Sequence, residues 1–458
     1  MSAAAESGSR SGLVRGLGPI ATTALVAGNV IGSGIYVMPA SLAEVAGPAS
    51  LIAWVVVAFC FLSLTSVYAD LAVALPVTGG LQVYAQRAFG DLAGFITAFL
   101  YWISAVIGNA AFVTAFVAYF QVFFPAFANP LNAFGLGLVF LWLLTLVNII
   151  GVRASGAVQV FTTIVKVLPL IVLSVAFFFA GSPANLTPFA PHGYWGLFPA
   201  ISLIAWLFIG TESATVPAEE VKGAGPAIRR AAYVGYALFA AIYLVLAFAI
   251  NYGLPASAIA GKASPLADAA GLLLGPAGVK FVTLGALISV AGILNGWLLV
   301  GGRLPLAAAR QGIAPAFLGR IHPRTGTPVV SLVFNSALTS CLVLLYFTGT
   351  LLNAYNFISL AATATALVAI AIACLAEVVL VRREPGLFTP ARRVRGPIVA
   401  VFGFLAVILM IIGTGLYPPA DHWYANVWFL TLCSMLVPIP LFYLFRVFRQ
   451  AQGPKSTA

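Results

Sequence analysis

The sequence predicts an all-α membrane protein with twelve transmembrane helices. Of its 458 residues, 62% are hydrophobic and only 7% are charged, a composition that excludes an ordinary water-soluble domain. Its apolar stretches are long enough to cross the hydrocarbon core of a bilayer, which is roughly 30 Å thick and needs about 20 helical residues. Positive charge alternates between the connecting loops, as is typical of a polytopic membrane protein.

The predicted spans follow one another along almost the whole chain. Their approximate bounds are 18–45, 48–74, 91–124, 131–152, 155–180, 194–221, 228–253, 273–304, 327–348, 352–381, 396–417 and 424–447. Residues 1–17 and 448–458 are polar tails. The first span is too long for the apolar core of a cleavable signal peptide, so no such peptide is expected.

Basic residues indicate the orientation of the chain. All Lys and Arg residues except Lys166, Lys262 and Lys280 fall on the tails or on alternate loops, among them the basic loop 382–395. Cytoplasmic loops carry such an excess, so both termini are expected to be cytoplasmic, with the chain in an inner or plasma membrane. Because the charge reports orientation, it does not indicate nucleic acid as a partner.

The first span carries the most informative motif, Asn29-Val-Ile-Gly-Ser-Gly34. A helix in lipid must satisfy its own backbone hydrogen bonds, so two glycines around a serine indicate an interruption. A second interruption, Ile209-Gly-Thr211, lies inside the span 194–221. Paired interruptions expose backbone amides and carbonyls to a polar ligand near the middle of the membrane, which is typical of secondary transporters.

The two interrupted spans also divide the chain. Each begins a run of five spans, one at 18–180 and the other at 194–381. An odd number of spans inverts the second run relative to the first, so a five-plus-five inverted repeat with discontinuous helices 1 and 6 is expected. The region 396–447 then adds two extra helices.

The first interruption is suited to binding a carboxylate. Gly34 permits close approach, Ser33 offers a hydroxyl group, and a half-helix beginning near Ile35 directs free N–H groups toward the ligand. Carbonyl groups freed around Ile209 would accept hydrogen bonds from an ammonium group, while Trp206 would cover the ligand. The alternative explanation of the glycines is close helix packing, and Trp206 is otherwise a packing aromatic.

Two charged residues lie deep within spans, where a charge costs at least ~2.5–3.5 kcal/mol. Glu212 follows the second interruption and is expected to couple transport to pH, unless it only bridges helices as a neutral acid. Lys166 lies too deep for its ammonium group to reach water. Carbonyls of the unwound first span would hold that group in place of a sodium ion, or as a structural tether.

Other polar residues allow fewer conclusions. Tyr101, Asn109 and Trp297 lie near the middles of their spans, where they line a pocket or only pack. The three histidines fall in loops: His192, His322 and His422. The sequence indicates no metal site, cofactor or catalytic triad, so an enzyme is not expected. A channel is less compatible with paired breaks, and saturable counterflow would distinguish the two classes.

Several motifs resemble the amino acid–polyamine–organocation (APC) transporter superfamily. They are Gly28-Asn-Val-Ile-Gly-Ser-Gly-Ile35, Tyr101-Trp102 with Ile107-Gly-Asn109, Trp206-Leu-Phe-Ile-Gly-Thr-Glu-Ser213, Ser264-Pro-Leu-Ala-Asp268 and Asn295-Gly-Trp297. The likeness is greatest to its bacterial arginine/agmatine antiporters and covers nearly the whole chain. It implies a bacterial inner-membrane exchanger of arginine, agmatine or related cationic amino acids and amines. Some relatives are dimers, so a homodimer is left open.

The resemblance also implies a substrate site. Its residues would be Asn29, Ile31, Ser33, Gly34, Tyr101, Ser104, Asn109, Trp206, Ile209 and Trp297. Ser33 and Gly34 would receive the carboxylate and the Ile209 carbonyl the amino group, while Asn109 and Trp297 would hold the side chain.

The remaining roles concern gating and pH. By the same resemblance, Trp206 would act as an outer gate, Tyr101 would contribute to the pocket wall and gating, and Asn29 would position the unwound strand. Glu212 matches the acid associated with pH response in these antiporters.

Two positions depart from the arginine/agmatine antiporters. Lys166 resembles the lysine of proton-coupled and neutral or broad-range members, where those antiporters have an apolar residue. Ala362 stands where they have a serine that contacts the substrate side chain, and alanine can neither donate nor accept a hydrogen bond. A proton-coupled or exchanging carrier of neutral or broad-range amino acids is therefore the alternative function.

Overall fold

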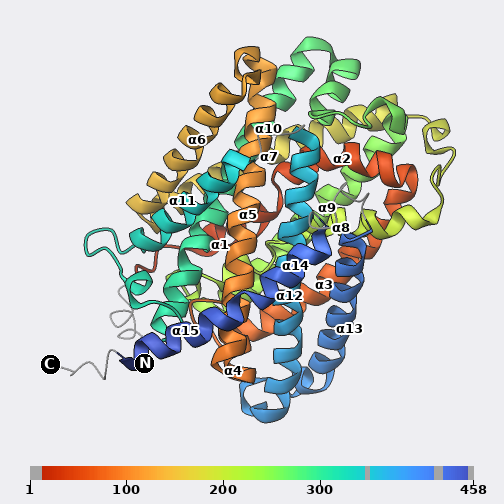
Figure 1. Ribbon diagram of the computed structural model, residues 1–458. Helices are drawn as coiled ribbons and strands as arrows, with labels where there is room; N and C mark the ends of the chain where they lie inside the picture. Colours follow the sequence, from red (N-terminus) through yellow and green to blue (C-terminus); the bar gives the residue numbers. More distant parts are fainter. Residues whose placement is uncertain (1–12, 346–350, 417–425, 452–458) are drawn as a thin grey trace.

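The computed structural model describes residues 13–345, 351–416 and 426–451. Within them the chain is helical, apart from turns and one isolated parallel bridge between Leu17 and Val221. The helices are α1 (Pro19–Val30), α2 (Ser33–Val45), α3 (Ser50–Ala74), α4 (Leu81–Phe89), α5 (Asp91–Phe123), α6 (Pro130–Ile150), α7 (Val152–Ala180), α8 (Leu197–Phe208), α9 (Ala224–Gly253), α10 (Pro265–Arg310), α11 (Val329–Leu345), α12 (Leu351–Arg383), α13 (Pro390–Thr414), α14 (Val427–Leu436) and α15 (Pro438–Ala451) (Figure 1).

Eleven helical segments of the described chain are long and apolar enough to cross a membrane. This result confirms the predicted all-α, multi-span class. The predicted ninth span, 327–348, corresponds to the shorter apolar helix α11, and residues 346–350 lie outside the described chain. Parts of the predicted tails, 1–12 and 452–458, and the loop that holds His422 also lie outside it.

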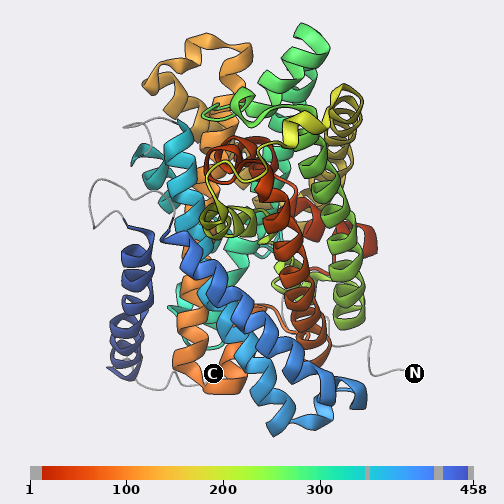
Figure 2. The ribbon, with the colours of Figure 1, turned by 90° about the vertical axis from the view of Figure 1, so that its right-hand side faces the viewer.

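The two interrupted spans lie at the centre of the bundle. Of the most apolar stretch in each, 83% of the residues are buried, against 22% for the last span, Val427–Val447. Figure 2 shows the final helices, in dark blue, at the outer edge of the molecule. Around the centre, α10 packs against α5 and α7, and α12 packs against α5 and α13.

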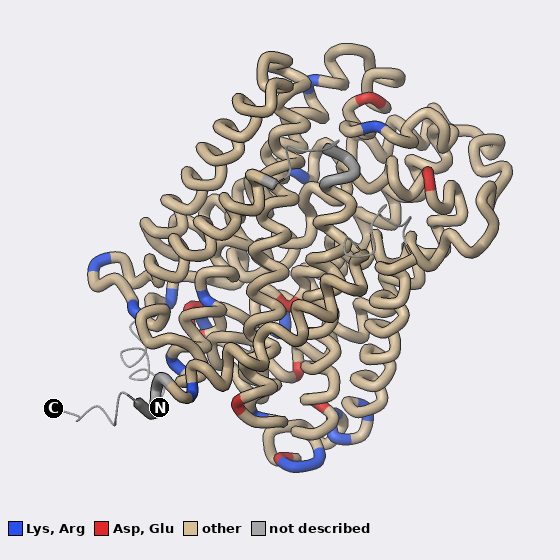
Figure 3. The backbone as a smooth tube through the Cα atoms, in the orientation of Figure 1, with Lys and Arg blue, Asp and Glu red and all other residues tan. Residues whose placement is uncertain are grey.

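Basic residues are unevenly distributed over the molecule. Figure 3 shows that most Lys and Arg residues lie toward its lower end, with few at the upper end.

The first predicted interruption is present, but the half-helix that follows it begins two residues earlier than expected. The helix α1 ends at Val30 and α2 begins at Ser33 instead of near Ile35. Gly32 lies in the break with φ −143° and ψ −145°, and a Cβ atom there would lie 2.1 Å from the Cδ1 atom of Ile293. A side chain at Gly32 would therefore require Ile293 of α10 to shift.

The second predicted interruption is also present, but the part of the span 194–221 after it does not resume as an α-helix. The α-helix of this span ends at Phe208, and the chain continues in two short 3₁₀ turns, Ser213–Thr215 and Ala218–Glu220. Gly210 has φ +122°, which ends helical geometry, and Pro217 has no N–H group to continue it. The apolar composition predicted the span but not this irregular second half.

The irregular segment is anchored by backbone and side-chain contacts. The N–H of Leu17 donates to the carbonyl of Glu220 at 3.0 Å, and the N–H of Lys222 donates to the carbonyl of Leu17 at 2.9 Å. The Glu220 carboxylate also forms a bidentate ion pair with Arg303 of α10, at 3.0 Å for both contacts. Both side chains are fully buried, so this pair fixes the segment to α10.

Arg392 corrects the expectation that residues 382–395 form a basic loop. The helix α13 begins at Pro390, and the Arg392 side chain is only 3% exposed. Its guanidinium group lies 2.5 Å from Asp70 of α3 and 2.7 Å from Glu377 of α12. Two carboxylates near span ends recruit the arginine, because a buried carboxylate needs a charged or hydrogen-bonded partner.

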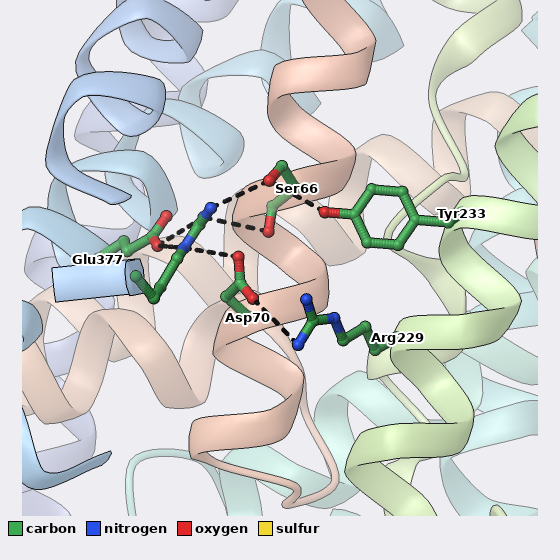
Figure 4. A network of polar contacts seen from close by, with 6 residues as sticks. Ser66, Asp70, Arg229, Tyr233 and Glu377 are labelled. Atoms are coloured by element: carbon green, nitrogen blue, oxygen red, sulfur yellow. Dashed lines mark hydrogen bonds and ion pairs between the residues drawn. The ribbon is translucent and has the colours of Figure 1, made fainter. Parts of the chain in front are cut away.

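Neighbouring polar groups extend this cluster. Arg392 also donates to the hydroxyl of Ser66 at 3.0 Å and to its carbonyl at 3.2 Å. From α9, Tyr233 donates to the Ser66 hydroxyl at 3.0 Å, and Arg229 lies 3.9 Å from Asp70 (Figure 4). The cluster thus connects four helices: α3, α9, α12 and α13.

Candidate functional site

The two interruptions touch each other. A Cβ atom on Gly210 would lie 2.8 Å from the carbonyl oxygen of Asn29, so only glycine allows this approach. Gly34 of α2 similarly packs against Leu207 of α8, whose Cγ atom would be 2.7 Å from a Cβ. Spans distant in sequence thereby place their unwound backbone side by side.

A small buried cavity lies between the interruptions. Its volume is about 10 Å³, which is room for about one water molecule. The lining residues are Asn29, Val30, Gly34, Phe112, Trp206, Leu207, Ile209, Ile293 and Trp297. Because both breaks and two tryptophans line one cavity, a polar ligand would meet backbone groups and aromatic faces together.

Trp206 is held in place on several sides. Its indole stacks on Phe112 with ring centroids 5.5 Å apart, and its N–H donates to the hydroxyl of Tyr355 at 3.1 Å. A Cβ on Gly108 would lie 3.0 Å from the ring. The indole therefore forms a fixed wall of the cavity.

Trp297 forms another wall of the cavity. Its N–H donates to the carbonyl of Asn29 at 3.1 Å, and its ring centroid lies 5.9 Å from that of Tyr101. At the same break, the hydroxyl of Tyr243 donates to the carbonyl of Val30 at 2.7 Å. Carbonyls freed by unwinding are thus satisfied by side chains of α9 and α10, as buried backbone groups require.

Lys166 satisfies the remaining carbonyls of the first break. Its ammonium group donates to Gly28 at 2.7 Å and to Ile31 at 2.5 Å, and the side chain is fully buried. No carboxylate pairs with it in the part of the chain that the structure describes. The predicted contact between Lys166 and the unwound carbonyls is therefore present.

Asn29 belongs to a polar network that the sequence did not reveal. Its side-chain oxygen accepts a hydrogen bond from Gln159 of α7 at 3.3 Å, and Gln159 in turn accepts one from Asn295 of α10 at 3.2 Å. The Nδ2 atom of Asn29 has no partner among the described residues. An unused donor thus lies on a residue that lines the cavity.

Glu212 is surrounded by hydrogen-bond donors. Tyr101 donates its hydroxyl proton at 2.5 Å, Gly210 its N–H at 3.2 Å to both carboxyl oxygens, and Thr211 its hydroxyl at 3.2 Å. The side chain is fully buried, and within the described chain no Lys or Arg pairs with it. Tyr101 thereby connects Glu212 to the Trp297 wall of the cavity.

The predicted site residues fall into two groups. Those that line the cavity are Asn29, Gly34, Trp206, Ile209 and Trp297. Those that do not line it are Ile31, Ser33, Tyr101, Ser104 and Asn109. The role of every one of them in binding stays a prediction.

Among the residues that do not line the cavity, Ser33 and Ser104 have hydrogen-bond partners and the side chain of Asn109 has none in the described chain. Ser33 contacts Tyr355 at 2.8 Å, and the hydroxyl of Ser104 donates to the carbonyl of Tyr101 in its own helix at 2.8 Å. Asn109 is buried, and its amide nitrogen and oxygen have no partner in the described chain. An unpaired amide is costly in a buried site, so the side chain of Asn109 is available to bind a polar ligand.

Several cavity and network residues were not predicted: Phe112, Ile293, Gln159, Asn295 and Tyr355. Asn295 lies next to Trp297 in a recognised motif, and Gln159 is an uncharged polar residue inside a span. Both features were visible in the sequence, but neither predicts which distant residue the side chain contacts.

On these observations, the protein is a multi-span membrane protein whose two interrupted spans enclose a small buried cavity, the arrangement of a secondary transporter. The chain belongs to the amino acid permease family, which matches residues 17–439. Among the described residues no group of three or more side chains could hold a metal ion.

Similar proteins are named as antiporters. The chain is 30% identical over 379 residues to an arginine/ornithine antiporter of Latilactobacillus sakei, covering 77% of this chain and 76% of that protein. It is 27% identical over 360 residues to an arginine/agmatine antiporter of Chlamydia felis (strain Fe/C-56), covering 75% and 73%. It is 28% identical over 333 residues to a cadaverine/lysine antiporter of Escherichia coli (strain K12), covering 72% and 74%.

Proposed function

We propose that this permease exchanges cationic amino acids and the related amines across a bacterial inner membrane by alternating access. The observation that carries the proposal is the single cavity enclosed by the two breaks and by Trp206 and Trp297. The similarity of the chain to proteins named as antiporters for arginine, ornithine, agmatine, cadaverine and lysine supports the substrate class.

The cavity offers different groups at its two breaks. At α2, the first N–H groups of a helix have no intrahelical acceptor and suit a carboxylate, with Ser33 and Gly34 beside them. At α8, the carbonyl of Ile209 accepts no hydrogen bond from the described part of the chain and suits an ammonium group. Asn109 and the face of Trp297 would hold the cationic side chain.

The cavity is too small for an amino acid, so the structure corresponds to a closed conformation. Substrate entry requires Trp206 or Trp297 to move away from its partners. Since Trp206 is held by Phe112 and Tyr355, its release is the step that we assign to the outer gate.

The predicted organisation accompanies this function. Residues 18–180 and 194–381 would form the inverted repeats, and 396–447 would form the two extra helices. With 1–17 and 448–458 both cytoplasmic, the basic end in Figure 3 would face the cytoplasm.

One observation favours a second candidate function. Lys166 donates to the carbonyls of Gly28 and Ile31, where a cation would otherwise neutralise the break, and Ala362 supplies no polar group on α12. A proton-coupled or exchanging carrier of neutral or broad-range amino acids would use Lys166 as its switch.

Uptake by proteoliposomes distinguishes these functions. Labelled arginine is offered to vesicles preloaded with agmatine and to empty vesicles, and we expect uptake to rise at least about tenfold with internal agmatine. The control is the same protein with internal glycine. Folded protein that takes up leucine or alanine but no arginine, lysine or ornithine would contradict the cationic assignment and support the second candidate.

A further inference from the structure

Tyr355 joins the two breaks through its hydroxyl group. The residue lies on α12 and is 1% exposed. Its hydroxyl oxygen lies 2.8 Å from the hydroxyl of Ser33 on α2 and 3.1 Å from the indole nitrogen of Trp206 on α8. Ser33 is fully buried and Trp206 is 8% exposed, so water does not compete strongly for these contacts.

The three groups carry three donor protons, but only two hydrogen bonds join them. An indole N–H can only donate, so the Tyr355 oxygen accepts the hydrogen bond from Trp206. The hydroxyls of Tyr355 and Ser33 each carry one proton, and the contact between them uses only one. Neither hydroxyl has another partner in the described chain, so one proton remains without an acceptor.

Backbone donors lie beside this cluster. The helix α2 begins at Ser33 without a side-chain cap, and the first N–H groups of a helix have no intrahelical acceptor. The unpaired Nδ2 atom of Asn29 is a further donor at the cavity. A buried cluster that has a surplus proton, with further donors beside it, is suited to an anion with several lone pairs, and a carboxylate has them.

We propose that Tyr355 is a specificity-determining residue that recognises, together with Ser33, the carboxylate of an α-amino acid substrate. This inference rests on the proposed function and deepens it. A decarboxylated amine has no group to accept the surplus proton, so it gains nothing from Tyr355. The residue thus favours the amino acid over its amine, and it distinguishes the two partners of an exchange.

The test compares arginine with agmatine, which differ in the carboxylate. Tyr355→Phe removes the hydroxyl and keeps the ring, and binding to purified full-length protein is measured by isothermal titration calorimetry. We expect arginine affinity to fall about tenfold, equivalent to about 1.4 kcal/mol, and agmatine affinity to stay within about twofold. In a double-mutant cycle, Ser33→Ala should add little to the loss in Tyr355→Phe, because the two hydroxyls act together.

A matched control is Tyr119→Phe. The Tyr119 hydroxyl is also fully buried and donates to α2, at the carbonyl of Tyr36 at 2.7 Å, but it contacts neither Ser33 nor Trp206. Its removal should change the affinities for arginine and agmatine by the same factor. Thermal unfolding of each variant reports whether the fold is retained.

The outcomes separate the inference from the proposed function. Equal losses for arginine and agmatine in Tyr355→Phe, or no loss for either, would make Tyr355 a structural residue and overturn the inference while the function stands. Folded wild-type protein that binds neither arginine and agmatine nor lysine and cadaverine would overturn both. If Tyr355→Phe does not fold, Ser33→Ala replaces it, and an unchanged arginine-to-agmatine ratio overturns the shared cluster.

Discussion

Individual side chains at the breaks take the place of missing helical hydrogen bonds. Lys166 and Tyr243 donate to carbonyls of the first break, and Glu212 accepts the N–H of Gly210 at the second. The Gly-Ser-Gly motif predicted the first break because two glycines around a serine weaken a helix that must satisfy its own backbone hydrogen bonds in lipid. It did not predict Tyr355 or Gln159, because the contact of a polar residue with a partner more than a hundred positions away leaves no local pattern.

Glu212 is the residue at which we expect protons to act. Glu212→Gln keeps the shape of the side chain and removes its ability to ionise, so the exchange rate should lose most of its dependence on pH between mildly acidic and neutral conditions. The measurement is arginine uptake at a series of pH values, equal on both sides of the membrane. Glu219→Gln is the control, because that acid is partly exposed and lies 3.9 Å from Arg310. A pH profile that matches the wild type in Glu212→Gln would assign the proton linkage to another group.

Whole elements show what apolar composition cannot predict. The length and hydropathy of 194–221 predicted a span, but the chain after Phe208 forms 3₁₀ turns. Its shape depends on tertiary contacts: the ion pair of Glu220 with Arg303 and the bridge from Leu17 to Val221. Tertiary contacts also explain why Arg392 was predicted to lie in a loop. Its sequence neighbourhood is basic, and only the structure shows that Asp70 and Glu377 hold it at the start of a buried helix.

The contact between the two broken elements depends on Gly210. Alanine there would be strained by φ +122° and would place its Cβ 2.8 Å from the Asn29 carbonyl. Gly210→Ala should therefore cost about 1–3 kcal/mol for the backbone alone and push the two breaks apart. We expect a lower melting temperature and an arginine affinity reduced by at least about tenfold, measured by thermal unfolding and calorimetry.

Gly193→Ala provides the comparison for this substitution. Gly193 also has a positive φ, +72°, but a Cβ there would meet no atom within 4 Å. It should lower stability through backbone strain without changing substrate affinity. If Gly210→Ala binds arginine as the wild type does, the contact between the breaks is not part of the site.

At the scale of the whole molecule, composition and charge were enough to predict the class of fold. They gave the multi-span helical architecture, and the alternation of basic residues agrees with their accumulation at one end in Figure 3. They could not predict which helices pack against each other. Nearly every span is apolar on all faces and has no apolar stripe that would mark its packed side. The exceptions are buried ionic contacts, which fix helices together at defined points.

The Arg392 cluster is the most extensive of these ionic contacts, and its loss should affect the whole fold. Arg392→Met leaves the carboxylates of Asp70 and Glu377 buried without their shared partner, since Arg229 reaches Asp70 only at 3.9 Å. Removing one partner of a buried ion pair costs about 3–5 kcal/mol, so we expect a melting temperature several degrees lower in detergent.

The charge origin of this loss can be separated from lost packing. Adding Asp70→Asn and Glu377→Gln to Arg392→Met removes the unpaired charges and should restore much of the stability. Lowering the pH should partly rescue the single variant for the same reason, because protonated carboxyls no longer need a cation. Arg393→Met is the control, since Arg393 is exposed and its side chain donates to the carbonyl of Phe388 at 3.1 Å but pairs with no carboxylate among the described residues. If the triple variant melts no higher than Arg392→Met at neutral pH, the arginine stabilises the four helices by packing and not by charge.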